Sequence, residues 1–137
     1  KDILIEFPQS VLNTSFAAGE DVRFSYPIGK KYNLYACANA KITHEDILDQ
    51  KTTLNIHYFR GFQNTLGVLH FVDSYRELSF YMRIIYDLLN CFFRSIAGIF
   101  FSSSAMLYYA KGQLSAIIVG LKAKWKKDSI LLYMEEN

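Results

Sequence analysis

The stretch "FYMRIIYDLLNCFFRSIAGIFF", Phe80 to Phe101, contains only three charged residues, and the aromatic clusters of the chain crowd around it. Apolar residues make up 51% of the chain and charged residues 20%, so their uneven distribution matters more than their totals. The spacing predicts a helix capped by Ser79 or a neighbour. Arg83 and Asp87 stand four apart and favour an ion pair that leaves the remaining circumference apolar. We therefore expect a soluble part followed by a membrane-associated or partner-covered part.

The segment that follows is too short for an ordinary membrane span. Between Arg94 and Lys111 run the uncharged residues "SIAGIFFSSSAMLYYA", whereas a transmembrane helix needs about 20 apolar residues. An interfacial or re-entrant helix fits better, and so does a helical hairpin that bends near Ser102 to Ser104. The last unit, "KGQLSAIIVGLKAKWKK", predicts a helix with a cationic end, where Trp125 beside lysines is typical of a headgroup boundary. The alternative is a helix bundle buried against protein.

Charge and cysteine content exclude several classes of function. The net charge of the 137-residue chain is +2, too small to indicate nucleic-acid binding, which usually needs a dense basic face. Cys37 and Cys91 have no partner at metal-site spacing, and two cysteines do not indicate a disulfide framework. The sequence starts at Lys1 with no secretory signal pattern. We therefore expect that it begins inside a longer chain.

The first half predicts helix and strand together. Acids in the first turn and lysines in the last predict a helix from Gly19, which should end or kink near Tyr26 because Pro27 cannot continue the hydrogen-bond ladder. "YNLYACA" and "AKITH" predict two short strands or one irregular strand. "LNIHYFRGFQNTLGVLHFV" has apolar residues at helical spacing, weakened by Gly61 and Gly67.

Alone, Glu20 and Asp21 would be ordinary acids at the start of a helix. In their order with the residues after them, they resemble the end of the catalytic domain of family 2 glycosyltransferases. The resemblance covers roughly residues 1–72 and is most specific from Gly19 to His44. It extends weakly to Arg60 and Asn64. The residues that carry the specific part are Gly19, Glu20, Asp21, Val22, Phe24, Ser25, Lys30, Lys31, Leu34, Ala40, Lys41, Ile42 and His44.

The resemblance implies a fold and a site. The fold would be the C-terminal fragment of an α/β, GT-A type nucleotide-sugar domain, in residues 1–50, followed by a connecting helical segment (51–78), membrane-associating helices (79–127) and a tail (128–137). Asp21 would be the general base that deprotonates the acceptor hydroxyl during an inverting transfer. Glu20, about 100° away around the helix, would orient the loop or bind acceptor hydroxyls. His44 would lie near the metal and diphosphate, or be a structural histidine.

The same resemblance implies the partners. They are a nucleotide-sugar donor, a lipid-linked or glycan acceptor, a divalent metal (Mg²⁺ or Mn²⁺) and the cytoplasmic face of a membrane. Two departures limit the expectation. Pro27 stands in the helix where many relatives carry an Arg, and the Asp-x-Asp metal element and the nucleotide-binding half are absent. We expect the segment alone to be inactive. The alternatives are a non-enzymatic, small membrane-associated interaction protein and a degenerate glycosyltransferase remnant.

Overall fold

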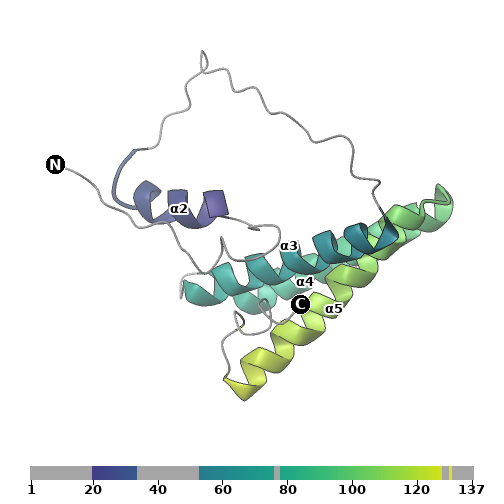
Figure 1. Ribbon diagram of the computed structural model, residues 1–137. Helices are drawn as coiled ribbons and strands as arrows, with labels where there is room; N and C mark the ends of the chain where they lie inside the picture. Colours follow the sequence, from purple (N-terminus) through teal and green to yellow (C-terminus); the bar gives the residue numbers. More distant parts are fainter. Residues whose placement is uncertain (1–19, 34–52, 76–77, 128–129, 131–137) are drawn as a thin grey trace, which may run out of the picture.

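The structure is a computed structural model that describes residues 20–33, 53–75, 78–127 and 130. Its elements are four helices: α2 (Glu20–Gly29), α3 (Leu54–Ser74), α4 (Phe80–Phe100) and α5 (Ser104–Lys126). The long helices α3, α4 and α5 follow one another with short connections, so α3 and α5 run in the same direction and α4 runs back between them in sequence (Figure 1). The shorter α2 lies over the C-terminal end of α3.

The core lies mainly between α3 and α5. Leu66 and Leu69 of α3 are fully buried against Ala116 and Ile117 of α5. These positions repeat three or four residues apart, which places them on one face of each helix. Phe80 and Ile84 of α4 complete the same cluster. The apolar spacing that predicts α3 is therefore confirmed: Phe62, Leu66 and Leu69 are buried, whereas Phe59, three residues before Phe62, is exposed.

Two glycines bring the backbones of α3 and α5 into direct contact. A Cβ atom on Gly61 would clash with the carbonyl oxygen of Tyr109, and a Cβ atom on Gly112 would clash with the carbonyl oxygen of Tyr58. The two helices share the spacing Tyr-x-x-Gly, at 58–61 and 109–112. Each glycine thus faces the carbonyl of the tyrosine in the other helix. No residue with a side chain fits at either position without separating the helices.

Two helix ends lie where the sequence predicts them. Ser79 is the N-cap of α4, and its side chain accepts a hydrogen bond of 3.3 Å from the backbone N–H of Met82. This confirms the predicted cap. The uncharged stretch forms a helical hairpin, one of the two predicted alternatives, with its turn at residues 101–103 and a left-handed backbone at Ser102 (φ 50°).

Two predictions were wrong. The described residues contain helices and no strand, so the α/β fragment with short strands is replaced by an all-helical arrangement. The physical reason is that the apolar faces of α3 and α5 bury one another, and no sheet is needed to cover them. The two predicted strands span residues 32–38 and 40–44, and all but Tyr32 and Asn33 of them lie outside the described residues. The predicted helix end near Tyr26 is also wrong, because α2 continues through Pro27 to Gly29. The other predicted outcome, a kink at Pro27, stays a prediction.

Candidate functional site

Glu20 and Asp21 lie in the first turn of α2, as predicted for acids at a helix start. The positions of their side chains are outside the described part of the chain, and so is His44. The structure does place the rest of this helix. The ring of Tyr26 contacts Phe71 and Tyr75 edge-on, with centroids 5.2 and 4.7 Å apart. Helix α2 is thereby fixed to the last turns of α3, which sets the end of the bundle where the predicted acids lie.

The two residues of the weaker resemblance on α3 lie apart from α2. Arg60 is exposed. Asn64 Nδ2 donates a 3.1 Å hydrogen bond to the Tyr109 hydroxyl, and the guanidinium of Arg94 stacks over the same ring at 4.2 Å from its centroid. These contacts join α3, α4 and α5, so Asn64 has a structural partner in the bundle.

Helix α4 exposes its apolar side chains and buries its charged ones, which is the opposite of the usual distribution on a surface helix. Every exposed residue of the helix is apolar or aromatic, whereas its charged residues are buried or half-buried. The exposed set runs the length of the helix and into the next turn, about 30 Å at 1.5 Å per residue: Tyr81, Met82, Ile85, Tyr86, Leu88, Leu89, Phe92, Phe93, Ile96, Ile99, Phe100 and Phe101. We call this set the α4 apolar face. Exposure is greatest at its end, with Phe100 at 81% and Ile99 at 71%.

The buried charge on α4 is the carboxylate of Asp87, which is 1% exposed. Arg83 pairs with it through both oxygens, with Nε–Oδ2 at 3.0 Å and Nη2–Oδ1 at 2.9 Å, confirming the predicted ion pair. Burial raises the pKa of Asp87, and the hydrogen bond and charge of Arg83 offset only part of that increase. The pair thus lies on the inner side of α4 and leaves the outer side without a charge.

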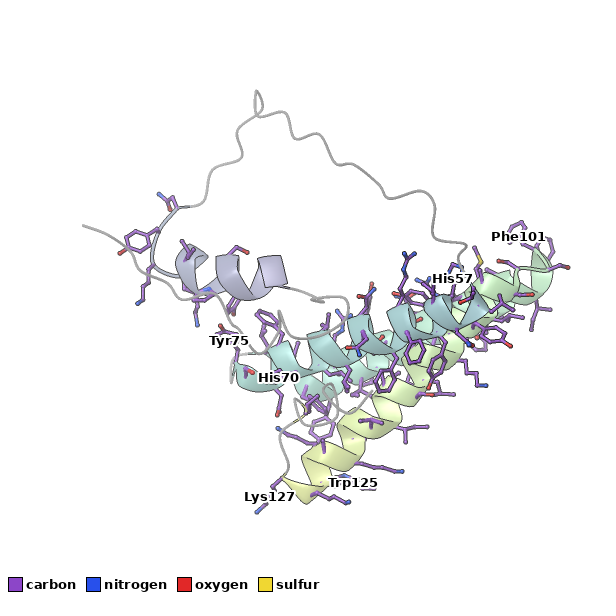
Figure 2. All side chains as sticks on the ribbon, in the orientation of Figure 1. His57, His70, Tyr75, Phe101, Trp125 and Lys127 are labelled. Atoms are coloured by element: carbon purple, nitrogen blue, oxygen red, sulfur yellow. The ribbon has the colours of Figure 1, made fainter. Side chains whose placement is uncertain are left out.

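A cationic end adjoins the start of the α4 apolar face. Lys124 Nζ lies 5.3 Å from the ring centroid of Phe80 and pairs with Asp73. Trp125 beside it is 79% exposed, and Figure 2 shows Trp125 and Lys127 together at this end of α5. Lys122 and Lys126 are exposed as well. Aromatic and cationic side chains therefore meet at one end of an apolar surface, as they do at a headgroup boundary.

Sequence reasoning did not find which side of α4 faces outward. Its polar residues recur at helical spacing and form a single stripe, which the usual pattern of a surface helix places toward solvent. In the structure this stripe is buried or half-buried instead: Arg83, Asp87, Asn90 and Arg94. The sequence feature that could have indicated this orientation is the spacing of Arg83 and Asp87. Two opposite charges four residues apart can form an ion pair, and such a pair can lie on the inward side of the helix.

The described residues do not form a metal site, since they contain no group of three or more His, Cys, Asp or Glu that could hold an ion. No step below is derived through the metal that the resemblance implies. Of the helices described, none combines the length and apolarity required to cross a bilayer.

Comparison with models of known families, with curated proteins and with solved structures finds no match. The class of protein that the geometry defines is a helical bundle with an outward apolar helix. The resemblance to family 2 glycosyltransferases stays a prediction.

Proposed function

We propose that this chain is the membrane-apposed, acceptor-side part of an inverting glycosyltransferase that works at the cytoplasmic face of a membrane. The proposed attachment to the membrane rests on one observation: every exposed residue of α4 is apolar or aromatic. The sugar transfer is supported by the order in which residues from Gly19 to His44 follow one another in the sequence, and by the helical start of α2 at Glu20.

The charge and composition of the α4 apolar face and its neighbouring end favour a lipid surface over a protein partner as the binding target. The α4 apolar face has no exposed charge, and its neighbouring end carries Trp125 among lysines. A bilayer accepts such a face in its acyl region while anionic headgroups attract the lysines. The opposite side of α4 packs on α5, so the helix would lie in the interface plane with the bundle above it.

The chemistry assigned to Asp21 is proton removal. The acceptor hydroxyl oxygen forms a bond to the anomeric carbon of the donor as the bond from that carbon to the diphosphate breaks. The electron pair leaves with the nucleotide diphosphate, and the hydroxyl proton passes to the Asp21 carboxylate. Glu20 would bind or orient acceptor hydroxyls.

Vesicle flotation tests the attachment. The chain should float with vesicles of mixed neutral and anionic phospholipid. The double variant Phe93→Ser, Phe100→Ser should float at least about tenfold less, because each exposed aromatic ring contributes roughly 1–2 kcal/mol on burial. Tyr32→Ser is the matched control, since it removes an exposed aromatic ring from outside the α4 apolar face. Equal flotation of both variants would exclude the face as the lipid contact.

Transfer is tested separately in the full-length natural protein. Asp21→Asn keeps the shape of the side chain and removes its basicity, so it should lower the rate of sugar transfer by about 10²-fold or more and leave flotation unchanged. Unchanged transfer would disprove the role of Asp21. In the same experiment, a wild-type protein that binds vesicles and transfers no sugar would support the second candidate.

The second candidate is a non-enzymatic membrane-associated interaction protein. The helical character of the described residues favours it, because α3, α4 and α5 form a helical bundle in place of the α/β fold that the resemblance implies. In this alternative, Glu20 and Asp21 only stabilise the start of α2.

A further inference from the structure

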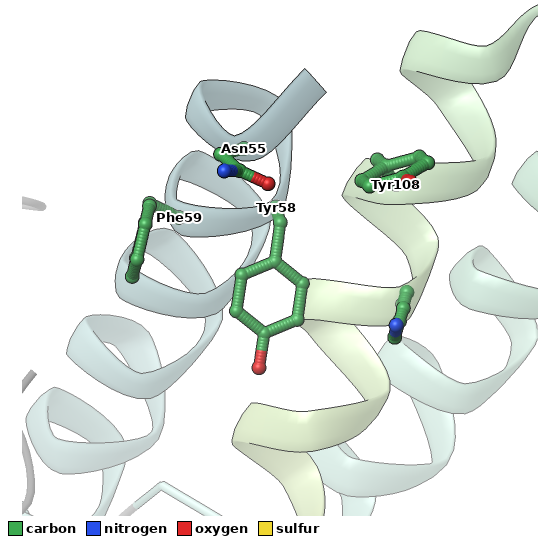
Figure 3. A pocket seen from close by; sticks show the side chains of 5 residues that line it. Asn55, Tyr58, Phe59 and Tyr108 are labelled. Atoms are coloured by element: carbon green, nitrogen blue, oxygen red, sulfur yellow. The ribbon is translucent and has the colours of Figure 1, made fainter. Parts of the chain in front are cut away.

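A cleft opens between the first turns of α3 and α5. It has a volume of about 320 Å³ and is lined by Asn55, Tyr58, Phe59, Tyr108 and Lys111. Figure 3 shows the Tyr58 ring between the two helices, with Asn55 above it and Tyr108 on the facing helix. The volume lies at the lower end of the range of small-molecule sites, about 300–1,000 Å³.

The aromatic wall of the cleft is held in place by packing. The Tyr58 ring stacks on the buried Phe62, with an interplanar angle of 16° and centroids 6.3 Å apart, and meets Phe59 edge-on at 5.6 Å. Directly below, Gly61 and Gly112 keep the two backbones in contact. The Tyr58 ring is therefore positioned before any ligand binds, which lowers the entropic cost of a contact with it.

The lining combines three kinds of contact. Aromatic faces are electron-rich and attract the C–H face of a sugar ring. The amide of Asn55 can both donate to and accept from hydroxyl groups. The exposed ammonium of Lys111 makes no ion pair within the described residues and can bind an anionic group as a point charge.

We infer that this cleft binds a pyranose that carries a phosphate or carboxylate group, as a part of the acceptor. The inference rests on the proposed function for the identity of the acceptor. Tyr58 lies thirteen residues before Phe71, where α2 is anchored, a distance of about 20 Å along α3. The cleft therefore holds a portion of the acceptor remote from Asp21, and it contributes binding energy at a distance from the bond that forms.

The position of the cleft agrees with an acceptor presented at a membrane. His57, the neighbour of Tyr58, lies at the same end of the bundle as Phe101 (Figure 2). That end also carries Ile99 and Phe100, the most exposed part of the α4 apolar face. The cleft and the most exposed part of the α4 apolar face therefore lie at the same end of the bundle, so that an acceptor anchored in the bilayer at this end would extend toward the cleft.

The experiment is an NMR titration of the ¹⁵N-labelled 137-residue chain with four small probes. Two carry the proposed chemistry: glucose 1-phosphate, which represents a sugar phosphate, and methyl glucuronide, which represents an acidic glycan. Inorganic phosphate and methyl glucoside are the single-feature controls. At least one of the first two should shift the amide signals of Asn55, Tyr58 and Lys111 with an affinity about tenfold above both controls.

Two variants test the lining. Lys111→Met should weaken that binding by about tenfold, and Tyr108→Leu by a similar factor, while Lys122→Met, an exposed lysine elsewhere on α5, should leave it unchanged. Circular dichroism confirms that each variant folds. Binding no tighter than that of phosphate alone, or equal effects of Lys111→Met and Lys122→Met, would overturn the inference.

The outcome is separable from that of the proposed function. A specific cleft in a chain whose full-length form shows no transfer would leave the cleft standing and remove the enzyme. Transfer that depends on Asp21, with no probe binding in the cleft, would do the reverse.

Discussion

Replacing Gly112 by alanine tests whether α3 and α5 are held at backbone contact. The new Cβ would clash with the carbonyl oxygen of Tyr58 and lie 2.9 Å from the backbone N of Phe62. Backbone atoms in the middle of a helix cannot rotate away, so the helices must separate. Overpacking costs about 1–3 kcal/mol, and a clash with backbone atoms belongs to the upper part of that range, about 2–3 kcal/mol. The better helix propensity of alanine offsets about 1 kcal/mol, which leaves a net loss of roughly 1–2 kcal/mol.

Gly120→Ala is the matched control on the same helix and interface. Its Cβ would meet only the Cδ1 methyl of Leu69, at 2.8 Å, and that methyl group ends a flexible side chain that can turn aside. The propensity gain should then balance or exceed the strain. We therefore expect a change in the free energy of unfolding between zero and a gain of about 1 kcal/mol.

The assay is urea unfolding followed by circular dichroism at 222 nm, with thermal melts of the same proteins. Gly112→Ala should lower the melting temperature by about 3–8 °C, and Gly120→Ala should leave it unchanged or raise it. If Gly112→Ala is as stable as the wild type, or if the two variants behave alike, the backbone contact does not determine the spacing of these helices.

Three further predictions concern buried or exposed side chains. Because Asp87 has a raised pKa in the folded state, the folded chain binds more protons than the unfolded chain above the ordinary value of 3.8; the free energy of unfolding should therefore fall as pH rises through that window. Asp87→Asn should flatten this fall in urea titrations, and Arg83→Met should steepen it. Cys91 is buried, and burial raises the pKa of its thiol. In a Cys37→Ser chain, this thiol should therefore react with a disulfide reagent at least about tenfold slower in the folded protein than in urea; equal rates would contradict its burial. Trp125, the only tryptophan, should be quenched more by lipids brominated near the headgroup than by lipids brominated at the chain end, and absence of quenching would count against the lipid contact.

Local features could be predicted from sequence because they depend on a few neighbouring residues. Ser79 caps α4 and Arg83 pairs with Asp87 since each interaction joins residues three or four apart. Helix α3 could also be predicted, because its apolar residues recur on one face. None of these signals identifies the partner that each helix packs against. The α/β assignment therefore depended on the resemblance and on the strand-like stretches in residues 32–44.

The role of Gly61 could not be read from its own helix. Within α3 it only lowers helix propensity, and the sequence analysis therefore counts it as a weakness. Its value comes from Tyr109, 48 residues later, whose carbonyl lies where a side chain would be. Comparing the two helices with each other reveals the shared Tyr-x-x-Gly spacing and would have indicated the contact.

The inward and outward sides of α4 have different environments, and both bear on how the bundle could lie on a membrane. The inward side of α4 packs on α5 and holds the Arg83–Asp87 ion pair, although the buried Asp87 Oδ1 and Arg94 Nε make no hydrogen bond within the described residues. The outward side carries no charge and can lie flat on a bilayer. A flat α4 places both of its ends at a similar depth, so the lysines beside Trp125 would meet the headgroups at one end while Ile99 and Phe100 would enter the bilayer at the other. A partner protein covering α4 would give no comparable reason for lysines and an exposed tryptophan beside the start of the α4 apolar face. Lipid binding therefore accounts for the apolar face and its cationic end with one orientation of the bundle.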